Sequence, residues 1–535
     1  MQIKLNYPTK ISFVFLIAAW MLCGCSPGAE EKKNVLFIIV DDLKPMLNSF
    51  GQGQIISPHI DQLTSKGVSF QSAYCQQAIC TASRMSFITG MRPDYTKIWD
   101  LSTNLRDIRP NAVTIPQHFK NNGYQTAGMG KVMHGAHNDD PVSWTIPFIT
   151  NDDLEYAEGY KQPANSYQSP EVHVKWDSLQ SALKNDPNAD KGWVAVNRIM
   201  KSAGLRPAVE SLDVPDAAYS DGASALKGIE LMKEFQENGE KFFLTMGFQK
   251  PHLPFAAPKK YWDLYDPKDI NLAAYQEKAM GAPAFANHNS GELNNYSDIA
   301  ENMNDKGKVT EEKQRELIHG YYACVSYVDV QIGLLMDHLK KSGLEENTIV
   351  VLMGDHGWHL GDHGLWNKHS NYEQATRTPL IFAGPGVDEG LKNKSTVELI
   401  DVFPTVCNLA GIEPPNDLDG ENLSPILNAQ AEKVKDYAIS QYPRRCNVVA
   451  SVIGKYPEDC TLMGYAVRND KFRYVAWVEG NYEDRTTFDE SMIVSEELYN
   501  YETDPLEKKS LASDPDFKVV KAELLAYLKS KIWSK

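Results

Sequence analysis

The chain has 535 residues, of which 42% are hydrophobic and 23% are charged. This is the composition of a globular protein, and it excludes a collagen, a coiled coil and a disordered chain. With 54 Lys and Arg against 70 Asp and Glu, the formal net charge is −16, which argues against a nucleic-acid partner held by a global basic field. We therefore expect any anionic ligand to be bound by a local cluster of cations, with or without a metal ion.

The first 25 residues have the pattern of an export signal. Lys4 and Lys10 form a short basic region before an apolar run at 11–24, which is too short to span a bilayer and has the length of a signal-peptide core. The run closes on Leu-Cys-Gly-Cys, which resembles a bacterial lipobox with Cys25 as the lipidated residue; a plain secretory signal is the alternative. We expect an exported periplasmic or cell-surface lipoprotein of a Gram-negative bacterium, held to the membrane only by its N-terminal lipid, with 26–33 as a polar tether.

From residue 34 onward, predicted strands and helices alternate. Aliphatic runs indicate buried strands at 35–40, 241–247, 348–353 and 379–383. Helices are indicated by capping residues and closing glycines, or by helical periodicity, at 57–67, 80–88, 114–121 and 310–341. This alternation predicts a large α/β domain with a mainly parallel central sheet. The stretch 136–215 is rich in Asn, Asp, Pro and aromatic residues, and we expect loops there, laid over the edge of the sheet.

The pattern changes beyond about residue 430. Runs of β-branched and aromatic residues at 436–441, 463–468 and 471–478 precede a helix that begins near Asp516. We predict a catalytic domain at 34–430 and a smaller α+β subdomain at 431–535 with an antiparallel sheet. In open α/β sheets the ligand binds outside the carboxyl ends of the strands, so we expect the functional residues at those ends.

Two of the predicted strands end on acidic residues. The first runs directly into Asp41 and Asp42, and the strand at 348–353 is followed by Asp355 and His356. Adjacent carboxylates at a buried strand end repel each other unless a cation lies between them, whereas a solvated turn with a helix cap is the alternative. Oxygen-rich ligands with one imidazole favour Ca²⁺ or Mg²⁺, so the two ends together predict a divalent-metal site.

Cys80 opens a predicted helix and Arg84 lies four residues later, which places both side chains on one face of its first turn. A helix N-terminus attracts anions, and the guanidinium fork suits tetrahedral oxyanions. A buried structural thiol is the alternative. Export permits disulfides, and Cys446 with Cys460 is the most plausible pair; Cys75 could also pair with Cys80.

The segment Cys80-Thr81-Ala82-Ser83-Arg84, continued to Thr89-Gly90, resembles the type I sulfatase signature C-x-(P/A)-S-R-x-x-x-x-T-G. In that family the cysteine is converted to formylglycine (3-oxoalanine), whose hydrate is the nucleophile. Further segments resemble the iduronate-2-sulfatase branch of the family: 34–42, 130–134, 250–255, 354–358, 365–368, 441–444 and 463–465. The resemblance implies the alkaline-phosphatase-superfamily fold, a sandwich with a large mixed sheet.

The resemblance also implies roles for individual residues. The implied Ca²⁺ ligands are Asp41, Asp42, Asp355, His356 and the modified Cys80. The implied sulfate-binding residues are Arg84, Lys131, His252 and Lys368, with His134 as the base that collapses the sulfated hydrate and His252 as the acid toward the leaving alcohol. Trp358 is a candidate for stacking on the sugar, with core packing as the alternative, and Arg444 is a candidate for binding a uronate carboxylate. Taken singly, the lysines could be surface residues and the histidines structural.

Residue 82 is Ala where most of the family has Pro, which implies maturation by an anaerobic formylglycine-generating enzyme. Our leading hypothesis is hydrolysis of 2-O-sulfate on uronic acid residues of glycosaminoglycan oligosaccharides of the heparan or chondroitin type. The alternatives are a sulfatase for another sulfated sugar, a phosphate or phosphonate monoester hydrolase of the same superfamily, and a lipoprotein that binds sulfated glycans without turnover.

Overall fold

The computed structural model of the protein describes residues 1–2, 32–135, 140–185, 192–445, 461–483 and 488–533. The predicted export signal, most of the tether and the Cys446–Cys460 pair lie outside these residues. Cys75 and Cys80 are inside them, and both are free thiols. No helix in the described part of the chain is both long and apolar enough to cross a membrane.

A seven-stranded sheet forms the centre of the molecule, with the strand order β11-β2-β10-β7-β1-β5-β3. β1 pairs in parallel with β5 and with β7, and β10 is antiparallel to both of its neighbours. The strands are β1 (Asn34–Val40), β2 (Gly67–Tyr74), β3 (Gln125–Gly130), β5 (Phe242–Phe248), β7 (Thr348–Gly354), β10 (Arg377–Ala383) and β11 (Leu391–Glu398). The predicted large, mixed and mainly parallel sheet is therefore confirmed.

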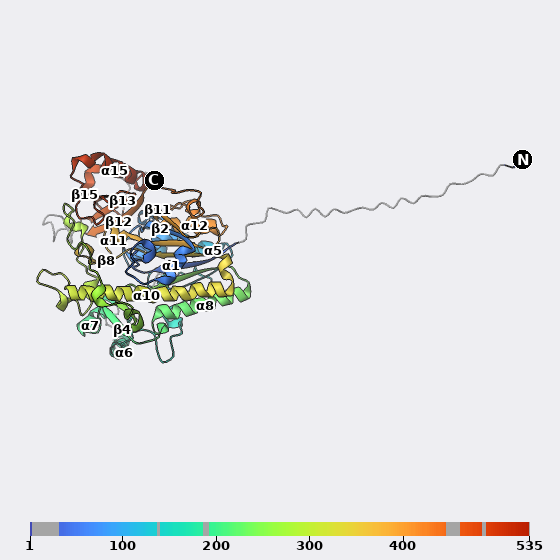
Figure 1. Cartoon of the computed structure of the whole chain (residues 1–535), viewed down its shortest axis with the longest axis horizontal. Helices are drawn as coiled ribbons and strands as arrows, with labels where there is room; N and C mark the ends of the chain where they lie inside the picture. Colours follow the sequence, from blue (N-terminus) through green and yellow to red (C-terminus); the bar gives the residue numbers. More distant parts are fainter. Residues whose placement is uncertain (3–31, 136–139, 186–191, 446–460, 484–487, 534–535) are drawn as a thin grey trace.

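Helices cover both faces of this sheet, as Figure 1 shows for α8 and α10 on one side. The alternate residues of β1 divide between two apolar clusters: Leu36 and Ile38 pack toward the first group of helices, and Phe37 and Ile39 pack toward the second. The first group is α1 (Pro58–Ser65), α8 (Ser220–Asn238) and α10 (Glu311–Ser342); the second is α2 (Cys80–Thr89), α5 (Ile115–Asn121) and α12 (Val402–Leu409). Burial on both faces explains why the central strands are continuously apolar.

The C-terminal region forms a second, four-stranded sheet in which all neighbours are antiparallel. Its strands are β12 (Ala438–Arg445), β13 (Thr461–Arg468), β14 (Phe472–Glu479) and β15 (Ile493–Asn500), and α15 (Lys518–Ile532) packs on it through Leu524 and Leu528. The predicted antiparallel sheet is confirmed, although β15 was not foreseen because two glutamates interrupt its apolar pattern. The exact domain boundary near residue 430 stays a prediction.

The expectation of loops throughout 136–215 was wrong. The described part of this stretch contains α6 (Pro170–Asn185), α7 (Trp193–Ser202) and β4 (Val209–Leu212), which pairs with β6 (Phe255–Pro258). Val172, Leu179 and Met200 belong to a small apolar cluster between the two helices. The polar residues that suggested loops cover the exposed faces of these short amphipathic helices.

Candidate active site

The acidic residues after β1 and β7 meet at the carboxyl edge of the sheet. Val40 is in register with Gly354, so Asp41 and Asp42 leave the sheet beside Asp355. The backbone N–H of Asp42 donates to Asp355 Oδ1 at 3.0 Å, and all three carboxylates are fully buried. The two strand ends therefore lie together, as the sequence predicted.

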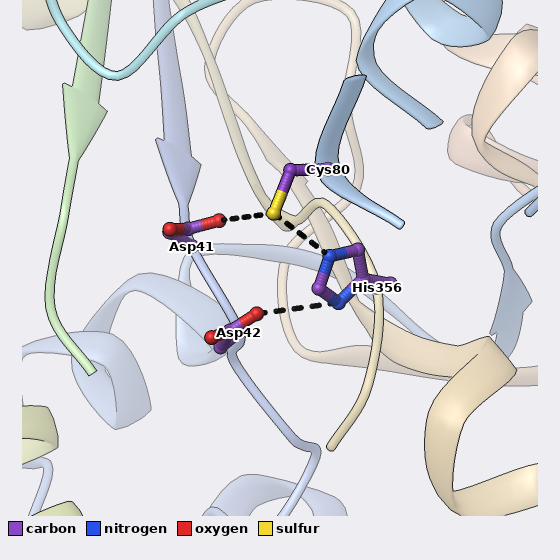
Figure 2. Close-up of side chains that lie close together, drawn as sticks. All are labelled: Asp41, Asp42, Cys80 and His356. Atoms are coloured by element: carbon purple, nitrogen blue, oxygen red, sulfur yellow. Dashed lines mark hydrogen bonds and ion pairs between the residues drawn. The ribbon is translucent and has the colours of Figure 1, made fainter. Parts of the chain in front are cut away.

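Four potential metal ligands converge at this edge, and Figure 2 shows their side chains pointing toward one another. Ligand atoms of Asp41, Asp42, Cys80 and His356 all lie within 4.8 Å of one another. Cys80 Sγ is 3.6 Å from Asp41 Oδ1 and 3.4 Å from His356 Nε2, and His356 Nδ1 is 3.5 Å from Asp42 Oδ1. Asp355 borders this group, with its Oδ2 3.4 Å from His356 Nε2.

The chemistry of these donors fits a divalent cation. Burial raises the pKa of Asp42 well above its usual range, against the opposing charge of Lys368. Burial acts in the same direction on Asp41, but Lys131, His252 and Arg84 together hold its pKa well below its usual range. Adjacent carboxylates without water are costly unless a cation neutralises them, and carboxylate oxygens with an imidazole are suitable ligands for such an ion.

Cys80 is the first residue of α2, and the preceding Ile79 is extended. The thiol is only 1% exposed, and burial, followed by the charge of Asp41, raises its pKa to about 11. Ser83 Oγ donates to the carbonyl of Asp355 at 2.5 Å, which fixes the first turn of α2 against the acidic strand end. An unmodified Cys80 is therefore a protonated and weak nucleophile at neutral pH.

Arg84 connects the two acidic strand ends. Its Nη2 donates to Asp41 Oδ1 and its Nε to Asp355 Oδ2, both at 3.0 Å, and its Nη1 donates to the carbonyls of Lys131 and Val132. Four of its five N–H donors are thus used inside the protein, and the side chain is fully buried. This geometry places Arg84 to orient the carboxylates, and its predicted contact with sulfate oxygens stays a prediction.

Two lysines flank the cluster. Lys131 Nζ contacts Asp41 Oδ2 and lies 3.5 Å from Cys80 Sγ, while Lys368 Nζ donates to Asp42 Oδ1 at 3.1 Å. Lys131 follows Gly130, which has a φ of 71° and on which a Cβ would stand 2.1 Å from the carbonyl of Gly247. Only glycine fits that position, so β3 turns sharply and delivers Lys131 to the site. Both lysines therefore lie beside the acidic cluster, and their binding of sulfate oxygens stays a prediction.

The two predicted histidines also lie here. Burial, followed by the charges of Lys131 and Arg84, lowers the pKa of His134 to about 2, so this ring is neutral and, in these surroundings, a weak base. His252 Nδ1 lies 2.6 Å from the carbonyl of Leu253, and its Nε2 lies 3.0 Å from Glu292 Oε1. Both nitrogens of His252 face acceptors, which favours its doubly protonated form, but burial and the charges of Lys131 and Lys368 lower its pKa overall.

Three residues of the site were not predicted from the sequence. Glu292 contacts Lys368, with Nζ to Oε2 at 3.2 Å, and His369, with Nε2 to Oε2 at 3.3 Å, in addition to His252. His369 Nδ1 lies 2.8 Å from the hydroxyl of Tyr442 on β12. His369 directly follows the matched segment 365–368 and Tyr442 lies within 441–444, so both could have been suspected, whereas no local pattern distinguishes Glu292.

Several residues of the site have strained backbones. Asp42, Asn367 and His369 have φ values of 60°, 82° and 46°, respectively, in the left-handed region that residues with a side chain rarely adopt. Asn367 and His369 flank Lys368, so the strain lies where the chain presents this lysine to Asp42. Such conformations persist only where the surrounding structure imposes them, and they cluster at functional sites.

Trp358 does not have the position that stacking on a sugar requires. Its side chain is fully buried in the large apolar cluster, so no ring face is open to a ligand. The ammonium of Lys368 instead lies 4.7 Å from the centroid of the indole ring, a distance typical of a cation–π contact. Trp358 is therefore packed in the core, which was the alternative to sugar stacking, and its ring contacts the ammonium of Lys368.

Arg444 is likewise engaged by the protein. Its guanidinium donates to the carbonyls of Phe285 (2.7 Å), Ala286 (3.2 Å) and His369 (2.8 Å), and it lies 4.5 Å from the ring centroid of Tyr442. With only 6% of the residue exposed, Arg444 is poorly placed to bind a uronate carboxylate. It instead ties β12 to the loop that carries His369 and to the segment that leads to Glu292.

Family profiles and individual relatives match the sequence over most of its length. The sequence profile described as Sulfatase matches residues 33–412, and the profile described as N-sulphoglucosamine sulphohydrolase, C-terminal, matches 361–533. Human iduronate 2-sulfatase is 33% identical, over 91% of this chain and 92% of its own length. A delta 4,5-hexuronate-2-O-sulfatase of Bacteroides thetaiotaomicron is 26% identical, over 95% of this chain and 90% of its own.

Solved structures show the same fold. A 2-O GAG sulfatase superposes with a TM-score of 0.60 at 22% identity, over 94% of this chain and 92% of that one. The phosphonate monoester hydrolase of Agrobacterium radiobacter superposes with a TM-score of 0.66 at 19% identity, over 94% and 95% of the two chains. These similarities confirm the alkaline-phosphatase-like architecture. Because the identities are 22% and 19%, they are evidence of the fold only.

Proposed function

The chain belongs to the sulfatase family and is a sulfuric ester hydrolase, and we propose that it removes 2-O-sulfate from uronic acid residues of glycosaminoglycan oligosaccharides. The observation that carries this proposal is the match, over more than nine-tenths of both chains, to a relative named iduronate 2-sulfatase. A second relative named for hexuronate 2-O-sulfate supports it. Both names specify a sulfate at the 2-position of a uronic acid.

We propose that Cys80 is converted to formylglycine and that Ca²⁺ is the metal, held by Asp41, Asp42, Asp355 and His356 with residue 80. When bound and formed, these two groups supply charge neutralisation for the sulfate and a geminal hydroxyl as the nucleophile. Ala82 in the signature supports maturation by an anaerobic formylglycine-generating enzyme. The high pKa of the unmodified thiol agrees with the need for such a conversion.

The other residues of the site have roles that their positions support. Lys131 and Lys368 lie on either side of the buried carboxylates and would bind the sulfate oxygens, while Arg84 fixes Asp41 and Asp355. His134 is neutral at working pH and would accept a proton from residue 80 only transiently, because its low pKa makes it a weak base. His252 would donate a proton from Nε2 to the leaving sugar alcohol, with Glu292 holding that proton in place.

The substrate claim is tested by sulfate release from disaccharides, using enzyme produced together with an anaerobic-type maturase. We expect turnover of a disaccharide with a 2-O-sulfated unsaturated uronate, and at least about 100-fold lower kcat/KM for one with a 6-O-sulfated hexosamine, since pockets built for a polar group discriminate strongly. Preference for the 6-O-sulfated sugar would refute the uronate claim and keep the sulfatase. Faster cleavage of an aryl phosphate or phosphonate than of any sulfate would favour the superfamily's other hydrolases.

We also propose that the protein is an exported lipoprotein anchored through Cys25, on the evidence of the N-terminal sequence pattern alone. The expected result is incorporation of labelled palmitate into the full chain in a Gram-negative host, and its loss in Cys25→Ala. Labelling that persists in this variant, or a soluble periplasmic product from the full chain, would contradict the anchor.

A further inference from the structure

A groove lies between the edge of the seven-stranded sheet and the C-terminal subdomain. Its walls come from β2, β10 and β11 on one side and from the chain that follows β13 and β15 on the other, and its volume is about 990 Å³. A second hollow of about 450 Å³ continues it, because Lys44, Gln52 and Gln374 line both. None of the active-site residues described above lines either hollow, so this groove is a separate feature of the surface.

The size and lining of this interdomain groove suit a carbohydrate. Its volume is at the upper end of the ~300–1,000 Å³ range of ligand sites, which also occur preferentially between domains, so there is room for several sugar rings. The walls present side-chain amides at Gln52, Gln71 and Gln374 and hydroxyls at Ser72 and Ser395. Such groups can exchange hydrogen bonds with sugar hydroxyls.

The charges in the walls favour an anionic ligand. Lys392 and Lys394 are exposed and alternate along β11, so both lie on one face of this edge strand. Arg377 uses its Nε on the carbonyl of Gln71 at 2.7 Å. Among the residues that the structure describes, none of these three cations forms an ion pair, whereas Lys44 and Arg468 in the same walls are paired with Asp362 and Glu373.

Acidic side chains are present as well, but they are fewer. Glu432 and Asp470 also line the groove, and Lys433 is paired with Asp436. The three unpaired cations therefore outnumber the two remaining carboxylates, in a chain whose formal net charge is −16. A local excess of positive charge on so acidic a protein concentrates anions at this place.

We propose that the interdomain groove is a second binding site for sulfated glycan, which holds part of a longer chain apart from the sugar being hydrolysed. The choice of a sulfated glycan rests on the proposed substrate class. Lys392 and Lys394 contact its sulfate or carboxylate groups, Arg377 at the start of β10 adds a third cation to the wall, and the amides contact neutral hydroxyls. The flexible lysine stems accept anionic groups without requiring one fixed geometry.

The test compares two double variants that change the net charge equally. Lys392→Ala with Lys394→Ala removes the groove cations, and Lys340→Ala with Lys341→Ala removes two exposed lysines at the end of α10. The probes are a heparin dodecasaccharide, for affinity at several salt concentrations, and a 2-O-sulfated disaccharide, for kcat and KM. We expect the groove variant to bind the dodecasaccharide about threefold to tenfold more weakly, with disaccharide kinetics unchanged.

A single isosteric change on the same groove sharpens the result. Gln52 is exposed and lines both hollows, so Gln52→Glu adds a negative charge with almost no change in shape and is expected to weaken dodecasaccharide binding at low salt. Equal losses of dodecasaccharide affinity in the groove and α10 variants would overturn the proposal. Lys392 and Lys394 would then serve only to prevent the edge strand β11 from pairing with another chain. Equal losses for dodecasaccharide and disaccharide would also overturn it, while failure of the wild type to cleave the disaccharide would count against the proposed function instead.

Discussion

The two halves of the active site are built in different ways. The metal half, which we define as Asp41, Asp42, Asp355, His356 and the start of α2, comes from strand and helix ends that the central sheet places in register. The substrate half, defined as Glu292, Lys368, His369 and Tyr442, comes from loops and from a strand of the other sheet. The central sheet holds the first half in place, whereas contacts among distant segments hold the second. Substitutions in the two halves should therefore change activity and stability to different extents.

The largest effect on activity is expected at Cys80, the first residue of α2 in the metal half. Cys80→Ala should lower kcat for sulfate release by about 10³-fold or more, as removal of a nucleophile does in other hydrolases, with little change in melting temperature. The matched control is Cys407→Ala, which removes a buried thiol from α12. Retention of more than a tenth of the activity by Cys80→Ala would contradict the assigned nucleophile.

Arg84→Lys tests whether the metal half depends on the guanidinium that joins its two strand ends. We expect kcat to fall by about 10²-fold and the free energy of unfolding to fall by ~3–5 kcal/mol, because one buried carboxylate loses its partner. Arg92→Lys is the control, since Arg92 is also buried and binds both oxygens of Glu398, at 2.6 and 2.8 Å, outside the site. Similar losses of kcat in the two variants would mean that Arg84 acts only through stability.

Glu292→Gln tests the substrate half. A charge-assisted hydrogen bond contributes ~1.5–3 kcal/mol, so kcat/KM should fall about tenfold or more. Burial lowers the pKa values of His252 and His369, and Glu292 opposes this shift. Without the carboxylate both pKa values fall further, so a limb of the pH profile that reports the acid form of His252 should move to lower pH. An unshifted profile, or the same loss in the exposed control Glu301→Gln, would contradict this role.

Arg444→Met separates positioning from substrate binding. If Arg444 only holds the carbonyls of His369 and Ala286 in place, kcat/KM should fall by the same factor for a 2-O-sulfated uronate and for an aryl sulfate that has no carboxylate. We expect a fall of about threefold to tenfold, because each lost hydrogen bond contributes ~1 kcal/mol. A loss confined to the uronate would restore the original expectation that Arg444 binds the carboxylate.

The smallest effect on activity is expected at Asp329, which lies outside both halves. Its carboxylate accepts the backbone N–H groups of His59 and Ile60 at the start of α1, and burial raises its pKa from 3.8 to about 7. The folded protein therefore binds this proton more tightly than the unfolded chain, so this group makes the free energy of unfolding fall as pH rises from about 4 to about 7. Asp329→Asn should flatten that part of the stability profile and leave kcat unchanged.

The same contrast explains what the sequence alone could predict. Asp41 and Asp355 follow long apolar strands, and Cys80 opens a helix closed by Gly90, so local patterns placed them correctly. Glu292 and His369 are brought to the site by contacts between distant segments, such as that of Glu292 with Lys368, 76 residues further along the chain, which no local pattern encodes.

Trp358 and Arg444 show the other limit of sequence reasoning. Their neighbourhood in matched motifs was predicted correctly, but burial and the direction of a side chain depend on the packed structure. In the structure both residues are buried and contact residues of the site, Trp358 through Lys368 and Arg444 through the carbonyl of His369. The helices α6 and α7 were missed for a related reason, because their apolar residues are few and belong to a small cluster that also includes Ala164 and Tyr167 of the preceding segment.

The most direct test of the account is the mass of the tryptic peptide that carries residue 80, measured on enzyme preparations of graded maturation. The account predicts an aldehyde in place of the thiol, in a fraction that rises in proportion to kcat for the 2-O-sulfated uronate disaccharide. Full activity in a preparation whose residue 80 is entirely an unmodified thiol would contradict it.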